Sequence, residues 1–114
     1  MEQVVKSLKA ISEEIRLRIL LLLLDREACV CELMAVFRMA QSRLSHHLIT
    51  LREAKLLEDE KRGKWNYYRL NTKLLNPVNR ELIISISRML INDDTIEMDK
   101  KKLASIKERM QICC

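Results

Sequence analysis

The chain has few of the residues that interrupt regular structure. Its 114 residues include one glycine, one proline and one phenylalanine, whereas hydrophobic residues make up 48% of the total. This composition excludes a disordered chain and favours an ordered, mostly helical domain. Long apolar runs are also missing, because the longest, Ile19–Leu24, is far shorter than the ~20 residues that span a bilayer. We therefore expect no contact with a membrane.

Two further absences concern compartment and catalysis. The N-terminal segment MEQVVKSLKA has charges among its apolar positions, so it does not have the pattern of a secretory signal. We therefore expect a cytoplasmic protein, whose cysteines stay reduced. The cysteines lack the Cys-x-x-Cys spacing of thiol reductases and have no partnering base, so we expect neither an enzyme nor a catalytic cofactor.

Basic residues outnumber acidic ones. The chain has 21 Lys and Arg against 16 Asp and Glu, which gives a net charge of +5. This balance favours an anionic partner such as nucleic acid. The length suggests one compact domain. We expect residues 1–92 to form a DNA-binding and dimerisation domain, and 93–114 to form a C-terminal helix with a Cys-Cys tail.

Hydrophobic periodicity divides the chain into helices and one hairpin. The segment 13–25 is apolar on nearly every side, which predicts a buried central helix. Ser12 is the expected cap of that helix, and Thr72 is the expected cap of the helix after the hairpin. Gly63 lies between two extended runs within 56–70, as a hairpin turn requires. Helices are predicted over 3–10, 13–25, 29–37, 41–54, 73–91 and 97–111.

The predicted order is α-α-α-α-β-β-α-α, a mainly α fold with a two-stranded β-wing. Two short helices joined by the break RMAQ form a helix-turn-helix candidate, and the basic hairpin that follows them is a wing. The sequence therefore predicts a winged helix-turn-helix. We expect it to be dimeric through the first helix, the segment 73–91 and the last helix, because 73–91 has apolar residues at the period of helix pairing.

The second of the two short helices has the pattern of a DNA-recognition helix. Leu44, Leu48 and Leu51 form a narrow apolar stripe that faces the core, so the opposite side faces outward. Polar and basic side chains at the N-terminal end of such a helix read base edges, and those of a wing contact phosphates. The candidate DNA contacts are Gln41, Ser42, Arg43, Ser45, His46 and Arg52 in the helix, with Lys61, Arg62, Lys64 and Arg69 in the wing.

Four segments, IRLRILLLL, CVCEL, QSRLSHHLITLREAKLL and RGKWNYYRL, follow one another within residues 8–71. Together they resemble the ArsR/SmtB family of winged helix-turn-helix repressors. The resemblance implies a homodimer on a palindromic operator, which it leaves when a metal ion or metalloid binds. Two positions depart from the family pattern: Arg38 is in the turn where glycine is common, and Ala40 is where serine often caps the recognition helix.

Cys29 and Cys31 lie two residues apart in the helix predicted over 29–37. Neighbours at this spacing are rotated by about 200°, so a regular helix keeps the two thiols apart. The resemblance implies that CVCEL binds arsenite, antimonite, cadmium or lead through these cysteines, and thiolates do select soft ions. We therefore expect binding to unwind or bend the start of this helix and to displace the recognition helix.

The number and positions of the cysteines limit which metal ion or metalloid we expect the protein to bind. As(III)-responsive relatives often have a third cysteine, which is Met34 here, and we expect Met34 to fill the core. Cadmium-responsive relatives add a cysteine before the site, and this chain has none, which favours As(III) or Sb(III) over Cd(II) or Pb(II). Cys113 and Cys114 join Cys29 and Cys31, form their own site or do nothing. The open alternatives are a thiol redox or sulfide-responsive repressor and a cadmium or lead sensor of the same fold.

The two histidines are adjacent on the recognition helix. They are about 100° apart around its axis, so His46 and His47 cannot hold one metal ion in regular geometry. We expect His46 to face DNA and His47 to make a structural hydrogen bond. Zinc-sensing relatives use histidines on the dimer helix, and the segment 74–110 has none, which disfavours a zinc site of that kind.

Overall fold

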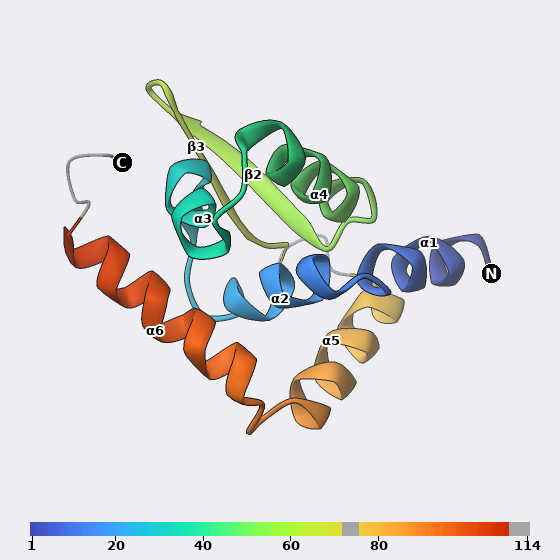
Figure 1. Ribbon diagram of the computed structural model, residues 1–114. Helices are drawn as coiled ribbons and strands as arrows, with labels where there is room; N and C mark the ends of the chain where they lie inside the picture. Colours follow the sequence, from blue (N-terminus) through green and yellow to red (C-terminus); the bar gives the residue numbers. More distant parts are fainter. Residues whose placement is uncertain (72–75, 110–114) are drawn as a thin grey trace.

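The computed structural model describes residues 1–71 and 76–109 of the chain (Figure 1). Within these residues, four helices precede the hairpin and two follow it, as the sequence predicts. None of these helices combines the length and the apolar character of a bilayer span. The elements are α1 (Glu2–Ile11), α2 (Glu14–Leu22), β1 (Ala28–Cys29), α3 (Val30–Phe37), α4 (Gln41–Glu53), β2 (Leu57–Arg62), β3 (Trp65–Leu70), α5 (Pro77–Met89) and α6 (Asp94–Arg109).

Helix α2 is the centre of the core, as its apolar composition predicts. Ile19 and Leu20 are completely buried, and α1, α4 and α6 all pack against α2. Figure 1 shows α6 running past α2 and α3, and its Leu103 and Ile106 belong to the same hydrophobic core. The C-terminal helix is therefore packed onto the helix-turn-helix.

A buried ion pair fastens α6 to α2. Nε and Nη2 of Arg18 donate to the two carboxylate oxygens of Asp99 at 2.9 and 2.8 Å. Asp99 is only 1% exposed, so its carboxylate depends on this fork-shaped partner in place of water. The Arg18 guanidinium also lies 5.2 Å from the centre of the Phe37 ring. One side chain of α2 thus contacts both α3 and α6.

Helix α2 has a different cap from the one predicted. Glu13, not Ser12, caps it, because the Glu13 carboxylate accepts hydrogen bonds from the backbone N–H groups of Ile15 and Arg16, both at 3.0 Å. A carboxylate at this position also offsets the positive end of the helix dipole. Ser12 instead ends α1. The prediction of Ser12 as the cap was therefore wrong by one residue.

Helix α5 begins at Pro77, within the predicted segment 73–91 and at the residue whose ring favours a helix start. Asn76 caps it by accepting the backbone N–H of Asn79 at 2.8 Å, and proline suits the first turn because it has no N–H to leave unpaired. The buried Asn79 side chain accepts a hydrogen bond from Ser7 of α1 at 2.5 Å. This bond fixes α5 against α1. Thr72, the predicted cap, lies outside the described residues.

The wing is an antiparallel hairpin of β2 and β3, with a short third strand beside it. The two long strands pair over all their residues, and Gly63 turns between them with φ of 63°, as a hairpin of this kind requires. Strand β1 pairs with the other edge of β3. The sequence pattern missed β1, because two residues are too few to show alternation. The wing is thereby attached to the segment that leads into α3.

The turn between α3 and α4 has both of the irregularities expected from the sequence. Arg38 ends α3 in the left-handed conformation, with φ and ψ both 51°, which glycine adopts at lower cost. Ala40 is the N-cap of α4 and makes no side-chain hydrogen bond there. The first N–H groups of α4 therefore receive no acceptor from the cap.

Restoring this cap should stabilise the protein. We expect Ala40→Ser to raise the free energy of unfolding by about 1 kcal/mol, because the serine Oγ accepts one of these N–H groups. Urea unfolding of both proteins at one protomer concentration measures the difference. Ala40→Val is the matched control, since its side chain has no acceptor. An equal gain in that variant would mean that capping is not the cause.

Candidate nucleic-acid interface and thiol site

Helix α4 presents a polar and basic face to solvent, as predicted. Leu44, Leu48 and Leu51 are completely buried, so the opposite side of the helix points outward. Such a face at a helix N-terminus has the donors and acceptors that pair with base edges in a major groove. Its exposed polar residues at the N-terminal end are Gln41, Ser42, Arg43 and His46, with Ser45 partly buried.

The buried side of α4 is anchored to α2 through His47. Its Nδ1 lies 3.3 Å from Nη1 of Arg16 and 3.7 Å from a carboxylate oxygen of Glu13. Burial lowers the pKa of His47, and the Glu13 carboxylate offsets only part of this effect. The neutral imidazole is thus favoured, and it can accept the Arg16 N–H. The predicted structural hydrogen bond of His47 is confirmed.

Three of the predicted DNA contacts already pair with carboxylates of the protein. All three are arginines, at the end of α4 and in the two strands of the wing. An arginine with a carboxylate partner must weaken that pair to reach a phosphate, so its net gain from DNA is reduced. The pairs are Arg52–Asp59 at 3.1 Å, Arg69–Glu58 at 2.9 Å, Arg69–Glu60 at 3.0 Å, Arg62–Glu60 at 2.9 Å, and Arg62–Glu27.

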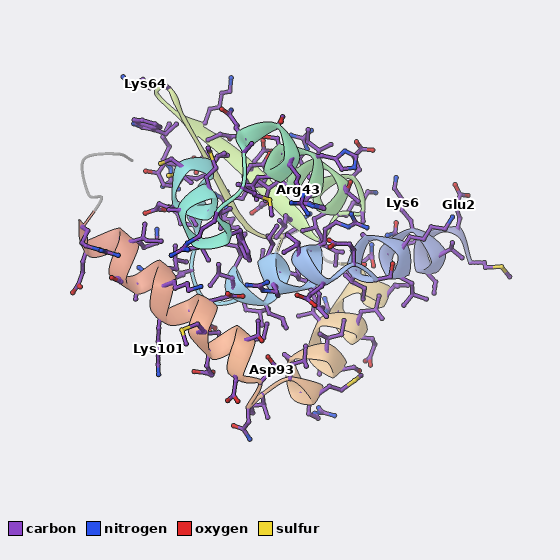
Figure 2. The ribbon with its side chains drawn as sticks, in the orientation of Figure 1. Glu2, Lys6, Arg43, Lys64, Asp93 and Lys101 are labelled. Carbon is purple, nitrogen blue, oxygen red and sulfur yellow. The ribbon has the colours of Figure 1, made fainter. Side chains whose placement is uncertain are left out.

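Two lysines of the wing differ from these arginines. Lys61 and Lys64 are exposed, and neither forms an ion pair with another residue in 1–71 or 76–109. Figure 2 shows Lys64 at the tip of the hairpin, where its ammonium lies 5.5 Å from the centre of the Trp65 ring. These lysines are the wing cations most available to phosphates.

The two cysteines of CVC meet because α3 starts one residue later than predicted. Cys29 is the last residue of β1 and caps α3 with extended backbone, φ −87° and ψ 164°, whereas Cys31 lies in the first turn of α3. The rotation of about 200° applies only when both residues are helical. The two Sγ atoms lie 2.9 Å apart. The premise that both cysteines are helical was therefore wrong, while the response of this helix to an effector stays a prediction.

Glu32 and Lys107 support the arrangement of the two thiols. The Glu32 carboxylate accepts the backbone N–H of Cys29 at 3.0 Å and the ammonium of Lys107 at 2.8 Å. Cys29 and Glu32 form a reciprocal capping box. Sequence reasoning missed both supporting residues. The available signal was a glutamate three residues after the cap, which is the spacing of a capping box.

The described part of the chain brings two cysteine sulfurs together. Cys29 is 1% exposed, whereas Cys31 is partly exposed. Within residues 1–71 and 76–109, no group of three or more His, Cys, Asp or Glu side chains could hold a metal ion. Met34 packs against the core, as predicted. Cys113 and Cys114, the other predicted ligands, lie outside the described residues.

Apolar side chains are exposed on α1 and α5. The two helices pack against each other (Figure 1). Exposed large apolar side chains on adjoining elements are a candidate interaction surface. The residues are Val4, Val5 and Leu8 on α1, with Ile84 and Met89 on α5.

Comparison with known proteins identifies the family. The family model of the bacterial regulatory protein, arsR family, matches residues 13–59. The arsenic resistance transcriptional regulator ArsR2 of Pseudomonas putida is 34% identical over 109 residues, which cover 93% of this chain and 93% of that protein. The chain belongs to the ArsR family. This result confirms the resemblance to the ArsR/SmtB family that the four sequence segments within residues 8–71 indicated.

Two solved structures share the fold of this ArsR-family chain. Reduced HlyU from Vibrio cholerae is 34% identical and has a TM-score of 0.66, and the match covers 77% of this chain and 88% of the HlyU chain. The homodimeric winged helix-turn-helix DNA-binding domain of Mb0332 from Mycobacterium bovis is 25% identical, covers 81% and 86%, and has a TM-score of 0.63. The predicted winged helix-turn-helix is therefore confirmed.

The buried His47 makes the stability of the protein depend on pH. Its folded pKa is below the ordinary value of 6.5, so the unfolded chain binds more protons in acid and stability is lost as the pH falls below about 6.5. We expect the free energy of unfolding in urea to fall between about pH 7.5 and about pH 5.5, and to fall less in His47→Gln. His46→Gln is the control, because it leaves the contact with Arg16 intact. The same pH dependence in all three proteins would contradict this account.

Proposed function

We propose that this ArsR-family protein is a homodimeric repressor that As(III) or Sb(III) releases from a palindromic operator. The observation that carries the proposal is the contact of Cys29 and Cys31, whose sulfurs lie 2.9 Å apart where the helix-turn-helix begins. Similarity to an arsenic resistance regulator supports the choice of a metalloid. We place the protein in the cytoplasm, where reduction keeps both thiols available.

Helix α4 and the wing lysines make the DNA contacts. Gln41 and Arg43 are exposed at the end of α4 that enters a major groove, where glutamine pairs with adenine and arginine with guanine. Lys61 and Lys64 neutralise phosphates beside the groove. In a dimer, two copies of α4 read half-sites about 34–36 Å apart, which makes the operator a palindrome.

The exposed apolar face of α1 and α5 supports the dimer. Leu8 of α1 is 46% exposed and Ile84 of α5 is 42% exposed in the single chain. A second copy offers the same face, as two-fold symmetry requires, so both copies bury apolar surface together. The similar domain of Mb0332 is itself homodimeric.

Arsenite reacts with thiols as As(OH)₃. Each thiol sulfur forms a bond to arsenic, and the thiol proton leaves with one hydroxyl group as water. Cys31 is the first sulfur that an effector from solvent meets, because Cys29 is buried. The third position on arsenic either keeps its hydroxyl group or takes a further thiol.

Cys113 and Cys114 are our candidates for that further thiol. Lys107 of α6 contacts Glu32, the residue after Cys31, at 2.8 Å. Helix α6 ends at Arg109, two residues after Lys107, and the four residue steps from Arg109 to Cys113 span at most about 14 Å of extended chain. The tail therefore starts close to this contact.

Effector binding acts on the junction between β1 and α3. An effector bonded to both sulfurs fixes Cys29 relative to Cys31. Because Cys29 belongs to β1 and Cys31 to α3, such a bridge sets the position of the strand against the helix. Strand β1 pairs with the wing, and α3 packs against α4. Both DNA-contacting elements are thereby displaced.

A thiol redox switch is the second candidate, because the same two sulfurs are near enough to be joined. With peroxide as oxidant, the two thiols give up two protons and two electrons to form an S–S bond, and the peroxide becomes two waters. One of the similar solved structures is reduced HlyU. A cadmium or lead sensor remains the alternative among metal-responsive proteins.

A titration of operator-bound protein tests these candidates. The operator is a duplex that the wild-type protein selects from random DNA, and binding is followed by fluorescence anisotropy. We expect arsenite to weaken binding roughly 5- to 150-fold, the usual range of allosteric coupling. Cys29→Ser and Cys31→Ser should each abolish the effect, whereas Met34→Leu should retain it.

The other outcomes separate the alternatives. Unchanged operator affinity at saturating arsenite and antimonite would refute the proposed effector. Release by peroxide alone would favour the redox switch, and release by cadmium or lead alone would favour a sensor of those ions.

The tail cysteines are tested in the same titration. We expect the combined Cys113→Ser and Cys114→Ser variant to need more arsenite for half-release, because its complex lacks one S–As bond. Its operator affinity without arsenite should equal that of the wild type. Matching arsenite curves would assign these two cysteines no part in the site.

A further inference from the structure

Arg62 joins the wing to the segment that carries the first thiol. It is the last residue of β2, yet its Nη2 donates to Glu27 Oε1 at 2.8 Å and its Nη1 contacts the other carboxylate oxygen. Nη2 also donates to Glu60 at 2.9 Å, and the guanidinium lies 4.4 Å from the centre of the Tyr67 ring. One side chain thus contacts both strands of the hairpin and the residue before β1.

These contacts converge on Cys29. Glu27 immediately precedes β1, which consists of Ala28 and Cys29, and Tyr67 is the β3 residue directly opposite Cys29. The Arg62 guanidinium therefore contacts Glu27, which precedes β1 in the chain, and Tyr67, which lies opposite β1 in the sheet. A movement of β1 relative to the hairpin must change at least one of these contacts.

The adjacent Lys61 has a different environment. Lys61 forms no ion pair within the described ranges, whereas Arg62 pairs with two carboxylates. A cation with two carboxylate partners has little net charge to offer a phosphate, while an unpaired ammonium binds one directly. The two residues are neighbours of like charge on one strand, so they form a matched pair for experiment.

We propose that Arg62 is a positioning residue that couples the thiol pair to the wing. When an effector bridges the Cys29 and Cys31 sulfurs, β1 and Glu27 shift with it. Arg62 passes this shift to the hairpin that carries Lys61, and the wing loses its alignment with the phosphates. This inference rests on the proposed function, because it assigns the route by which thiol binding weakens DNA binding.

The test measures the salt dependence of operator binding and its response to arsenite in one set of full-chain variants. We expect Lys61→Gln to lower the slope of log K against log salt by about two per dimer, one for each lost phosphate contact, with the arsenite response kept. Arg62→Gln should keep the slope. Its arsenite effect should fall from roughly 5- to 150-fold to below about threefold.

Two more variants separate charge from geometry. Arg62→Lys keeps the charge but lacks the planar fork, so we expect it to lose the arsenite response as Arg62→Gln does. Glu27→Gln removes the carboxylate partner of Arg62 next to β1, so we expect this variant to lose the arsenite response as well. Combining it with Arg62→Gln should cause no further loss of that response. Circular dichroism and urea unfolding verify that each variant is folded.

A lower salt slope in Arg62→Gln with a full arsenite response would make Arg62 a phosphate contact and overturn the inference. A full response in both Arg62→Gln and Arg62→Lys would overturn it as well. If arsenite fails to release the wild-type protein, the proposed effector fails instead. The same comparison with whichever of cadmium, lead or peroxide does release it then decides the role of Arg62.

Discussion

The extended backbone at Cys29 is the constraint on which the thiol site, the wing and the helix-turn-helix all depend. One residue both ends β1 and caps α3, with φ −87° and ψ 164°. Because it is extended, its side chain does not follow the helical rotation, and its sulfur meets that of Cys31. Because it is in a strand, its backbone pairs with Tyr67 of the wing. Any bridge between the two sulfurs therefore links β1 to the first turn of α3.

Buried carboxylates attach the C-terminal helix to this unit. Asp99 of α6 binds the Arg18 fork of α2, and Lys107 of α6 binds Glu32, which also accepts the Cys29 N–H. A buried carboxylate without a partner is costly, so each pair restricts where α6 can lie. The helix-turn-helix and α6 are thereby held as one body, and α6 contacts the cap of the thiol site.

Opposite charges give the wing its shape as well as its function. Acidic residues of β2 hold Arg52, Arg62 and Arg69, whereas Lys61 and Lys64 extend without carboxylate partners in the described residues. A count of basic residues cannot separate these roles, because both kinds carry the same charge. The separation depends on which side chains face a carboxylate across the hairpin.

The sequence by itself determined the helix-turn-helix, the wing and the family, because periodicity, one glycine at a turn and ordered motifs are properties of neighbouring residues. It also determined which side of α4 is buried, through the spacing of three leucines. Only the tertiary structure decided that Cys29 leaves the helix, since a strand of two residues exists only where β3 is present to pair with it. The tertiary structure likewise decided the partners of Arg62 and Lys107, which come from segments 35 and 75 residues away along the chain. Local patterns carry no information about such distant contacts, and these contacts place the thiols beside the wing.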